Sequence, residues 1–295
     1  FTNWIHKKLL ELNPHSRFMV CPMIYNGRGR NPYIERLGRQ LNQEIDLMWT
    51  GREVRSPYID SVDAEVFRND AGRFPLYWDN FPVNNLSMRF ELHMGPLIGR
   101  QPELAITSRG LLSNPMNQFE CSLLPLFTIG KFLSNPDEYN PDEAWREGFS
   151  RLYADQELAD ELMRFFRTVM SSPINSDAAP EFRKKLNEGI TLLRQGDKES
   201  ASSRIQELAE QIIRDVELLM DHPDPTDVLI EIQPWLPKYR LGGESLIALA
   251  AFVADPSSDN RAELQKRADK LDANRYSVFG DVLDGIIDEV LRSSY

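Results

Sequence analysis

Residues 44–80 read EIDLMWTGREVRSPYIDSVDAEVFRNDAGRFPLYWDN and contain two apolar runs separated by a helical pattern. The two runs, EIDLMWT at 44–50 and FPLYWDN at 74–80, are short and nearly continuous, which is typical of strands covered on both faces. The segment between them, residues 57–69, begins with a proline, and proline is well tolerated in the first turn of a helix. This strand–helix–strand order predicts a parallel sheet.

The same alternation continues on both sides of this unit. We predict further strands at residues 17–25 (RFMVCPMIY) and 103–109 (ELAITSR), a helix at 32–43, and another helix after Asn114. Four strands in the first ~135 residues make about half of an eight-stranded (β/α)8 barrel of about 250 residues. A half barrel leaves an unpaired strand at each edge. Because the chain starts at Phe1, inside a helical pattern, we expect it to be the second half of a barrel that lacks its N-terminal half.

Only helical patterns follow residue 135, while residues 171–180 and 221–227 have the composition of loops. We therefore predict an α/β fold, with a partial barrel in residues 1–135 and an all-α helical bundle in residues 136–295. Two amphipathic stripes at helical spacing support the bundle. They are Ile205, Leu208, Ala209, Ile212, Ile213 and Val216, and then Phe279, Val282, Leu283, Ile286, Ile287 and Val290.

The composition of the 295 residues, with 41% apolar and 27% charged side chains, is typical of a globular protein. A formal charge of −11 argues against nucleic-acid and anionic-membrane partners, which require a basic surface. No apolar run is long enough to predict a membrane-spanning helix. Two cysteines, four scattered histidines and an incomplete Gly27-x-Gly29 motif predict no metal site and no cofactor. The sequence does not distinguish a secreted or periplasmic protein from a cytoplasmic one.

Candidate site residues follow from the predicted strand ends, because barrel active sites lie at the carboxyl ends of the strands. Aromatic rings there would stack on a sugar, and neutral amides and hydroxyls would bind its hydroxyl groups. The sequence therefore predicts a site for a neutral polyol. The residues concerned are Cys21, Tyr25, Trp49, Thr50, Trp78, Asn80 and Asn114.

Several of these residues also have ordinary structural interpretations. Trp49 and Trp78 fit a core between sheet and helices. Asn80 suits a turn, and Asn114 suits the N-cap of the helix that follows it. Cys21 suits a small buried side chain better than a nucleophile, because no histidine lies nearby to activate it.

Residue types alone also suggest a catalytic pair. Asp79 and Glu53 are carboxylates near the ends of neighbouring predicted strands. On that basis they form an acid/base hypothesis.

Five motifs in order resemble glycoside hydrolase family 84. They are CPMIY (21–25), WTGREV (49–54), WDNFPVNN (78–85), GPLIGR (95–100) and SNPM (113–116), and the resemblance covers roughly residues 1–145. This family contains protein O-GlcNAcases and bacterial β-N-acetylglucosaminidases, some of them described as hyaluronidases. The resemblance implies an enzyme that removes N-acetylglucosamine from a glycan or glycoprotein.

The resemblance also implies a mechanism. Such enzymes retain configuration through an oxazoline formed by the substrate's own acetamide, an exception to the usual carboxylate nucleophile. Tyr25 would donate a hydrogen bond to the acetamido oxygen. The two adjacent catalytic aspartates of the family lie on a strand that would precede Phe1, so we expect residues 1–295 alone to be inactive. This expectation replaces the hypothesis of Asp79 with Glu53.

The remaining site residues are assigned by their motif positions. Asn85 stands where the family has an aspartate that binds sugar hydroxyls, which turns a charge-assisted hydrogen bond into a neutral one of about half the strength. The alternative to an enzyme is a non-catalytic carbohydrate-binding or scaffold protein that keeps the pocket. By the resemblance, Cys21, Thr50, Val54 and Trp78 shape the acetamide pocket, and Asn80 and Asn114 bind the sugar or its catalytic aspartate.

Overall fold

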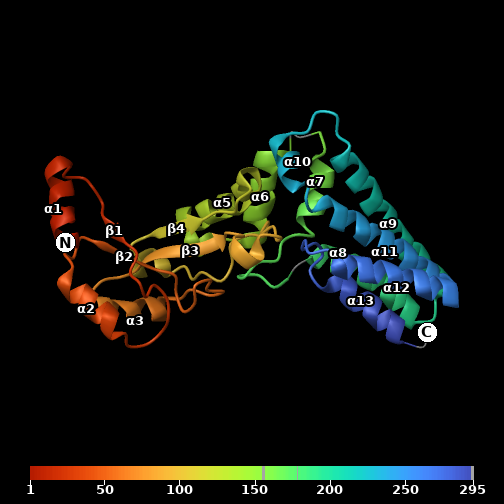
Figure 1. The fold of residues 1–295 in the computed structure, drawn as a ribbon, viewed down its shortest axis with the longest axis horizontal. Coiled ribbons are helices and arrows are strands. Elements are labelled where there is room, and N and C mark those ends of the chain that lie inside the picture. The colour runs from red at the N-terminus through yellow and green to blue at the C-terminus, as the bar shows by residue number, and fades with distance from the viewer. Residues whose placement is uncertain (155–156, 178, 294–295) are drawn as a thin grey trace.

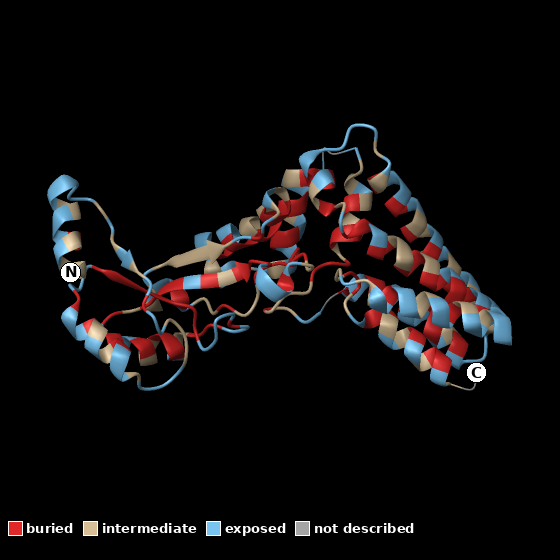
Figure 2. Cartoon of the chain, viewed as in Figure 1, coloured by how far each residue is buried: buried red, intermediate tan, exposed pale blue. Residues whose placement is uncertain are grey.

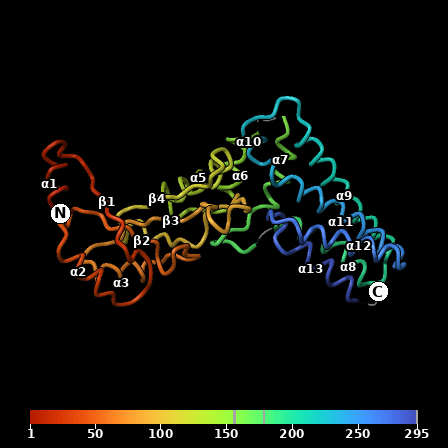
Figure 3. Tube along the Cα trace, in the orientation of Figure 1, coloured from red at the N-terminus to blue at the C-terminus, as the bar shows by residue number. Residues whose placement is uncertain are grey.

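The computed structural model describes residues 1–154, 157–177 and 179–293. A sheet with its helices occupies one end of the molecule, and a group of helices occupies the other (Figure 1). The N-terminus lies at the sheet end and the C-terminus at the helical end, as the chain trace shows (Figure 3). No helix in the described ranges is long and apolar enough to cross a membrane.

The sheet has four strands in the order β1-β2-β3-β4, and each neighbouring pair is parallel. Its central strand β2 is buried along its whole length, whereas Met19 in the edge strand β1 is 41% exposed. The curled sheet is half of a barrel, and this confirms the predicted fold class. The strands are β1 (Met19–Val20), β2 (Asp46–Trp49), β3 (Leu76–Pro82) and β4 (Leu111–Asn114).

Two helices cover one face of this sheet. α2 (Pro32–Gln40) and α3 (Ser61–Ala71) bury Ile34 and Phe67 in one cluster with Leu47 of β2. Each helix has a capped first turn: the Asn31 side chain accepts from the backbone N–H of Tyr33 and Ile34, and Asp60 accepts from Asp63. The other helices of this end are α1 (Thr2–Leu12), α4 (Leu104–Thr107) and α5 (Phe119–Ser134).

The fourth predicted strand, residues 103–109, is wrong. Residues Leu104–Thr107 form α4, and β4 begins only after Gly110, whose φ is +134°. Leu104 is 4% exposed but Ile106 is 78% exposed, so this apolar run buries one side only. Periodicity cannot distinguish a strand from a helix in an apolar run this short. The strand is formed instead by the next segment, LLSN at Leu111–Asn114.

Several predicted boundaries also change. β1 has two residues instead of nine, because Pro22 interrupts the run. α3 begins at Ser61 instead of residue 57, and α5 begins after Gln118, so Asn114 is not its N-cap. Phe279 lies before α13 with φ +67°, outside the helix that was predicted to contain it.

The helical end is held by an apolar core that runs along its axis. The predicted stripe on α9 is confirmed, because Ile205, Ala209, Ile212 and Val216 are all buried. Buried residues face inward between α9 and α11, and exposed residues face outward (Figure 2). The helices are α6 (Pro141–Tyr153), α7 (Ala159–Phe166), α8 (Pro180–Arg194), α9 (Lys198–Met220), α10 (Asp227–Ile232), α11 (Leu236–Ala254), α12 (Ser258–Ala273) and α13 (Val282–Arg292).

The two ends share a continuous core. Met94, from the segment after β3, lies in the same buried cluster as Trp145 of α6, and the Trp145 indole donates to the Met94 carbonyl at 2.6 Å. Nearby, the Trp235 indole donates to the Phe90 carbonyl at 2.8 Å. The helices therefore support the segment that follows β3. The division of the chain at residue 135 stays a prediction.

Candidate active site

A cavity of about 580 Å³ opens at the carboxyl ends of the four strands. This volume is within the usual range of small-ligand sites, roughly 300–1,000 Å³. The structure brings all eight residues assigned from the sequence to the lining of this cavity, while their roles stay predictions. They are Cys21, Tyr25, Thr50, Val54, Trp78, Asn80, Asn85 and Asn114. Sequence reasoning missed the role of Met48, Arg55, Val83, Leu86 and Ser87 in the lining.

Tyr25 is held beside the end of β2 by its backbone. Its carbonyl accepts from the Thr50 N–H at 2.8 Å, and the Gly27 N–H donates to the Gly51 carbonyl at 2.9 Å, so parallel pairing resumes beyond β1. The ring of Tyr25 is half-buried. Among the residues that the structure describes, nothing hydrogen-bonds its hydroxyl. The hydroxyl is therefore available to a ligand in the cavity.

A tight turn after β2 brings Val54 to the same cavity. Gly51 has φ +96°, and a Cβ at this position would lie 2.4 Å from the Ser56 Oγ. That hydroxyl donates to the Thr50 carbonyl at 2.8 Å and accepts from the Glu53 N–H at 3.0 Å, which closes the turn. Only glycine fits both the backbone conformation and the close contact.

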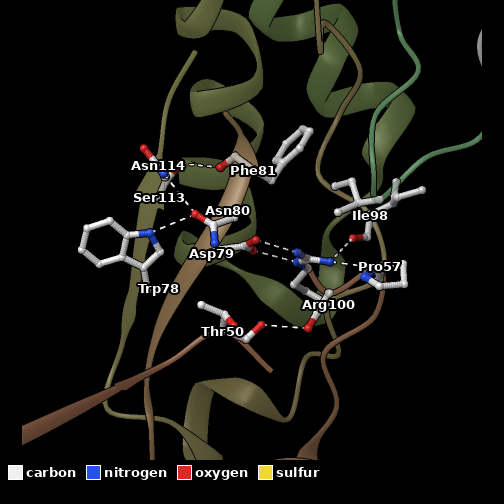
Figure 4. A network of polar contacts seen from close by, with 12 residues as sticks. Thr50, Pro57, Trp78, Asp79, Asn80, Phe81, Ile98, Arg100, Ser113 and Asn114 are labelled. Atoms are coloured by element: carbon white, nitrogen blue, oxygen red, sulfur yellow. Dashed lines mark hydrogen bonds and ion pairs between the residues drawn. The ribbon is translucent and has the colours of Figure 1, made fainter. Parts of the chain in front are cut away.

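A chain of amides links β3 to β4 (Figure 4). The indole of Trp78 donates to the Asn80 Oδ1 at 3.0 Å, and the Asn114 Nδ2 donates to the same oxygen at 3.0 Å. Because an indole N–H is a donor only, the atom of Asn80 that faces it must be the oxygen. The Asn80 Nδ2 then donates to the Val54 carbonyl at 2.6 Å. Within the described residues, these hydrogen bonds leave the Asn114 Oδ1 as an acceptor that can meet a ligand.

Asp79 points away from the cavity, to the opposite side of β3 (Figure 4). Side chains alternate along a strand, so Trp78 and Asn80 share one face and Asp79 takes the other. Its carboxylate makes a bidentate pair with Arg100, at 2.8 Å to Nε and 2.6 Å to Nη2, and both side chains are buried. Glu53 is exposed and does not border the cavity. The hypothesis that Asp79 and Glu53 form an acid/base pair is therefore wrong.

The end of the third motif presents Asn85 and buries Asn84. Asn84 is fully buried, donates to the Glu91 carbonyl at 2.9 Å and accepts from the Asn117 N–H at 3.0 Å. Asn85 is exposed at the cavity, and its neighbour Leu86 is 79% exposed with φ +55°. The register of the loop therefore directs Asn85, and not Asn84, to the cavity.

The two tryptophans divide between core and cavity. Trp49 is 5% exposed and packs on Phe67 of α3, with ring centroids 4.8 Å apart. Its structural interpretation is confirmed, although it also borders the cavity. Trp78 is 36% exposed and presents its ring to the cavity.

Cys21 is exposed, so the expectation of a buried side chain is wrong. The reason is its position beside the edge strand β1, which no further strand of the described residues covers. Partial desolvation raises the pKa of the Cys21 thiol, which disfavours the thiolate. This supports the view that Cys21 is a wall of the cavity and no nucleophile.

Charge is scarce around the cavity. In the described part of the chain, no aspartate or glutamate borders it, and Arg55 is its one charged lining residue. Within the same ranges no cluster of three or more histidine, cysteine, aspartate or glutamate side chains is arranged to hold a metal ion. The lining as described can bind and orient a neutral sugar, but it contains no carboxylate for general acid catalysis.

Comparison with known proteins identifies the family. Residues 1–167 match the family model described as beta-N-acetylglucosaminidase. The protein O-GlcNAcases of Rattus norvegicus and Mus musculus are each 32% identical to the chain over 134 residues, which is 43% of this chain and 14% of theirs. A solved structure of a mutant O-GlcNAc hydrolase from Thermobaculum terrenum is 25% identical with a TM-score of 0.84, and the match covers 99% of this chain and 65% of that one. The chain therefore belongs to the β-N-acetylglucosaminidase family, glycoside hydrolase family 84, and spans less than two thirds of the length of each of these relatives.

Proposed function

We propose that this chain is part of a β-N-acetylglucosaminidase that removes terminal β-linked N-acetylglucosamine from glycoproteins or glycans. The observation that carries the proposal is that one cavity collects residues from all four strand ends and is lined by neutral amides and by Tyr25. Membership of the family supplies the reaction class. The reaction retains configuration with assistance from the substrate.

In this reaction the acetamido carbonyl oxygen attacks the anomeric carbon, the glycosidic bond breaks, and a general acid protonates the leaving oxygen. Water then opens the oxazoline. The hydroxyl of Tyr25, which has no partner among the described residues, donates to the acetamido oxygen and holds it in line for attack. Thr50, Val54, Trp78 and Cys21 enclose the rest of the acetamide.

The amides act at the hydroxyl side of the sugar. Asn114 accepts from a substrate hydroxyl, or from a protonated acid, through its free Oδ1. Asn80 acts through its neighbours, because its amide is committed to Trp78, Asn114 and Val54. Asn85 meets hydroxyl groups at the exposed end of the cavity.

The general acid and the residue that orients the acetamide must come from elsewhere. The described lining holds no carboxylate, and β1 is an unpaired edge directly beside Tyr25. We propose that a strand ending in two adjacent aspartates pairs with this edge in the complete protein. The test is to sequence the gene upstream of Phe1 for such a strand and to assay the complete protein with 4-nitrophenyl β-N-acetylglucosaminide. Absence of both the pair and the cleavage would make the chain a non-catalytic carbohydrate-binding protein.

Residues 1–295 alone are expected to give no turnover of the same glycoside. The physical reason is the absence of a proton donor from the described lining of the cavity. Release of 4-nitrophenolate is the measurement, with circular dichroism as the control that the helices have formed. Measurable turnover by a folded sample would place the acid within these residues and contradict the proposal.

The substitution Asn85→Asp in the complete protein is expected to raise kcat/KM about fivefold. A charge-assisted hydrogen bond is roughly twice as strong as a neutral one, and a gain of about 1 kcal/mol corresponds to that factor. Steady-state kinetics on the 4-nitrophenyl glycoside measures the effect. Asn84→Asp is the matched control, because that side chain is buried among three partners and should lower stability without raising kcat/KM. An unchanged kcat/KM in Asn85→Asp would show that Asn85 does not touch the sugar.

A further inference from the structure

A second hollow of about 740 Å³ adjoins the cavity and shares Val54, Arg55 and Ser87 with it. Its other wall comes from the segment between α7 and α8 and from the connection between α12 and α13. These segments contribute mainly neutral hydroxyl and amide side chains. We call this hollow the serine groove, after Ser171, Ser172, Asn175, Ser176 and Ser277, which line it.

The serine groove is an extension of the cavity and not an isolated site. Because the two hollows share three residues, a group attached to a sugar in the cavity has this space directly beside it. Its volume is within the range of sites that hold small ligands or short segments. Hydroxyl and amide side chains suit the backbone N–H and carbonyl groups of an extended polypeptide.

Arg55 lies at the junction of the two hollows, and its guanidinium has no partner among the described residues. Within the described residues its guanidinium makes no hydrogen bond, ion pair or ring contact, and the residue is exposed. The neighbouring arginines are committed: Arg52 pairs with Asp60 at 2.8 Å and Arg100 pairs with Asp79. A free guanidinium fork fits the planar carboxylate of an acidic side chain, which it can bind with two parallel hydrogen bonds.

Neither acidic residue that lines the groove pairs with Arg55. The carboxylate of Glu91 lies 2.9 Å from the His93 ring, so it is directed to that partner. Glu53 borders the groove but not the cavity, and no ion pair joins it to Arg55. The junction itself therefore carries a positive charge. It stands out on a chain whose net charge of −11 repels acidic ligands at longer range.

We propose that Arg55 makes the enzyme select N-acetylglucosamine carried on an acidic polypeptide segment, by binding the carboxylate of a residue next to the glycosylated one. The inference rests on the proposed function and adds a substrate preference to it. Arg55 is the specificity-determining residue, and the serine groove receives the peptide backbone.

The test compares two glycopeptides with the complete protein. The residues that flank the glycosylated serine are aspartate in one peptide and asparagine in the other, so the two differ in charge but hardly in shape. We expect kcat/KM to be about threefold to fivefold higher for the aspartate peptide at low ionic strength, as for an exposed ion pair. The ratio should fall toward one in about 0.5 M salt, because ions screen exposed charges.

Variants separate Arg55 from the general charge of the protein. Arg55→Gln should bring the ratio to one or below, and Arg55→Lys should keep part of the preference. Arg36→Gln is the matched control, because Arg36 is exposed on α2 and borders neither hollow. It removes the same charge and should leave the ratio unchanged.

The possible outcomes are distinct. A ratio of one in the unmodified protein, or the same ratio in Arg55→Gln, overturns the inference. A third outcome uses two disaccharides, N-acetylglucosaminyl-glucuronic acid and its glucose counterpart. If the protein prefers the glucuronic acid compound through Arg55 but does not discriminate between the peptides, the inference of a polypeptide substrate is overturned, and Arg55 binds a uronic acid instead. Loss of cleavage of both peptides while the 4-nitrophenyl glycoside is cleaved also overturns it. Failure on the 4-nitrophenyl glycoside itself defeats the proposed function.

Discussion

Tyr25→Phe in the complete enzyme is expected to lower kcat about 100-fold and to change KM much less. Removal of one preorganised hydrogen-bond donor from a developing charge costs roughly 100-fold to 1,000-fold in rate. We expect the lower end, because the acetamido oxygen keeps its position through the enclosing walls of the pocket. The hydroxyl of Tyr25 has no partner among the described residues, so its loss should leave the fold intact.

The measurement is steady-state kinetics on the 4-nitrophenyl glycoside, with kcat and KM read separately. Tyr58→Phe is the matched control. Tyr58 is also partly exposed, but its hydroxyl accepts from Gln101 and it borders neither hollow. A kcat in Tyr25→Phe that equals the control would remove Tyr25 from the chemical step.

Arg100→Met is expected to lower the free energy of unfolding by about 3–5 kcal/mol, the usual effect of leaving one partner of a buried ion pair alone. Asp79 would be left without its partner in a site where it is 2% exposed. The substitution also removes the donations from Arg100 to the carbonyls of Pro57 and Ile98, which tie together the segments on either side of β3. Denaturant unfolding of the complete protein measures the effect.

The control is Arg36→Gln, which removes an exposed arginine and should change stability by less than about 0.5 kcal/mol. Asp79→Asn tests the other partner of the pair. If Asp79 were a catalytic acid, this variant would lose activity at nearly unchanged stability. The structure predicts a loss of stability instead. A loss below about 1 kcal/mol in both variants would contradict the buried pair.

Local sequence patterns were sufficient for most of the secondary structure near the site. The runs that became β2 and β3 have bulky apolar side chains over the length of a strand, and Pro32 marks the start of α2 in the sequence and in the structure. Local patterns failed for the fourth strand, where Leu104–Thr107 is helical. The balance there depends on which side of a short apolar segment is covered, and that is a tertiary property.

For the site residues, too, some features follow from the sequence and others depend on tertiary contacts. Their gathering follows from the topology, because parallel strands deliver their carboxyl ends to one edge. The direction of Asp79 was readable from the alternation of side chains along β3. Its partner was not, since Arg100 lies 21 residues away along the chain.

The sequence by itself therefore determined the succession of β2, α3 and β3, the parallel half barrel and the family motifs. These are set by periodicity, by residue type and by the rule that parallel strands share an edge. Only the tertiary structure decided that Asn84 is buried while Asn85 faces the cavity, that Cys21 is exposed, and that Arg55 keeps a free charge at the junction with the serine groove. Each of these outcomes depends on which distant segment packs against the residue, and no local pattern in the chain encodes that contact.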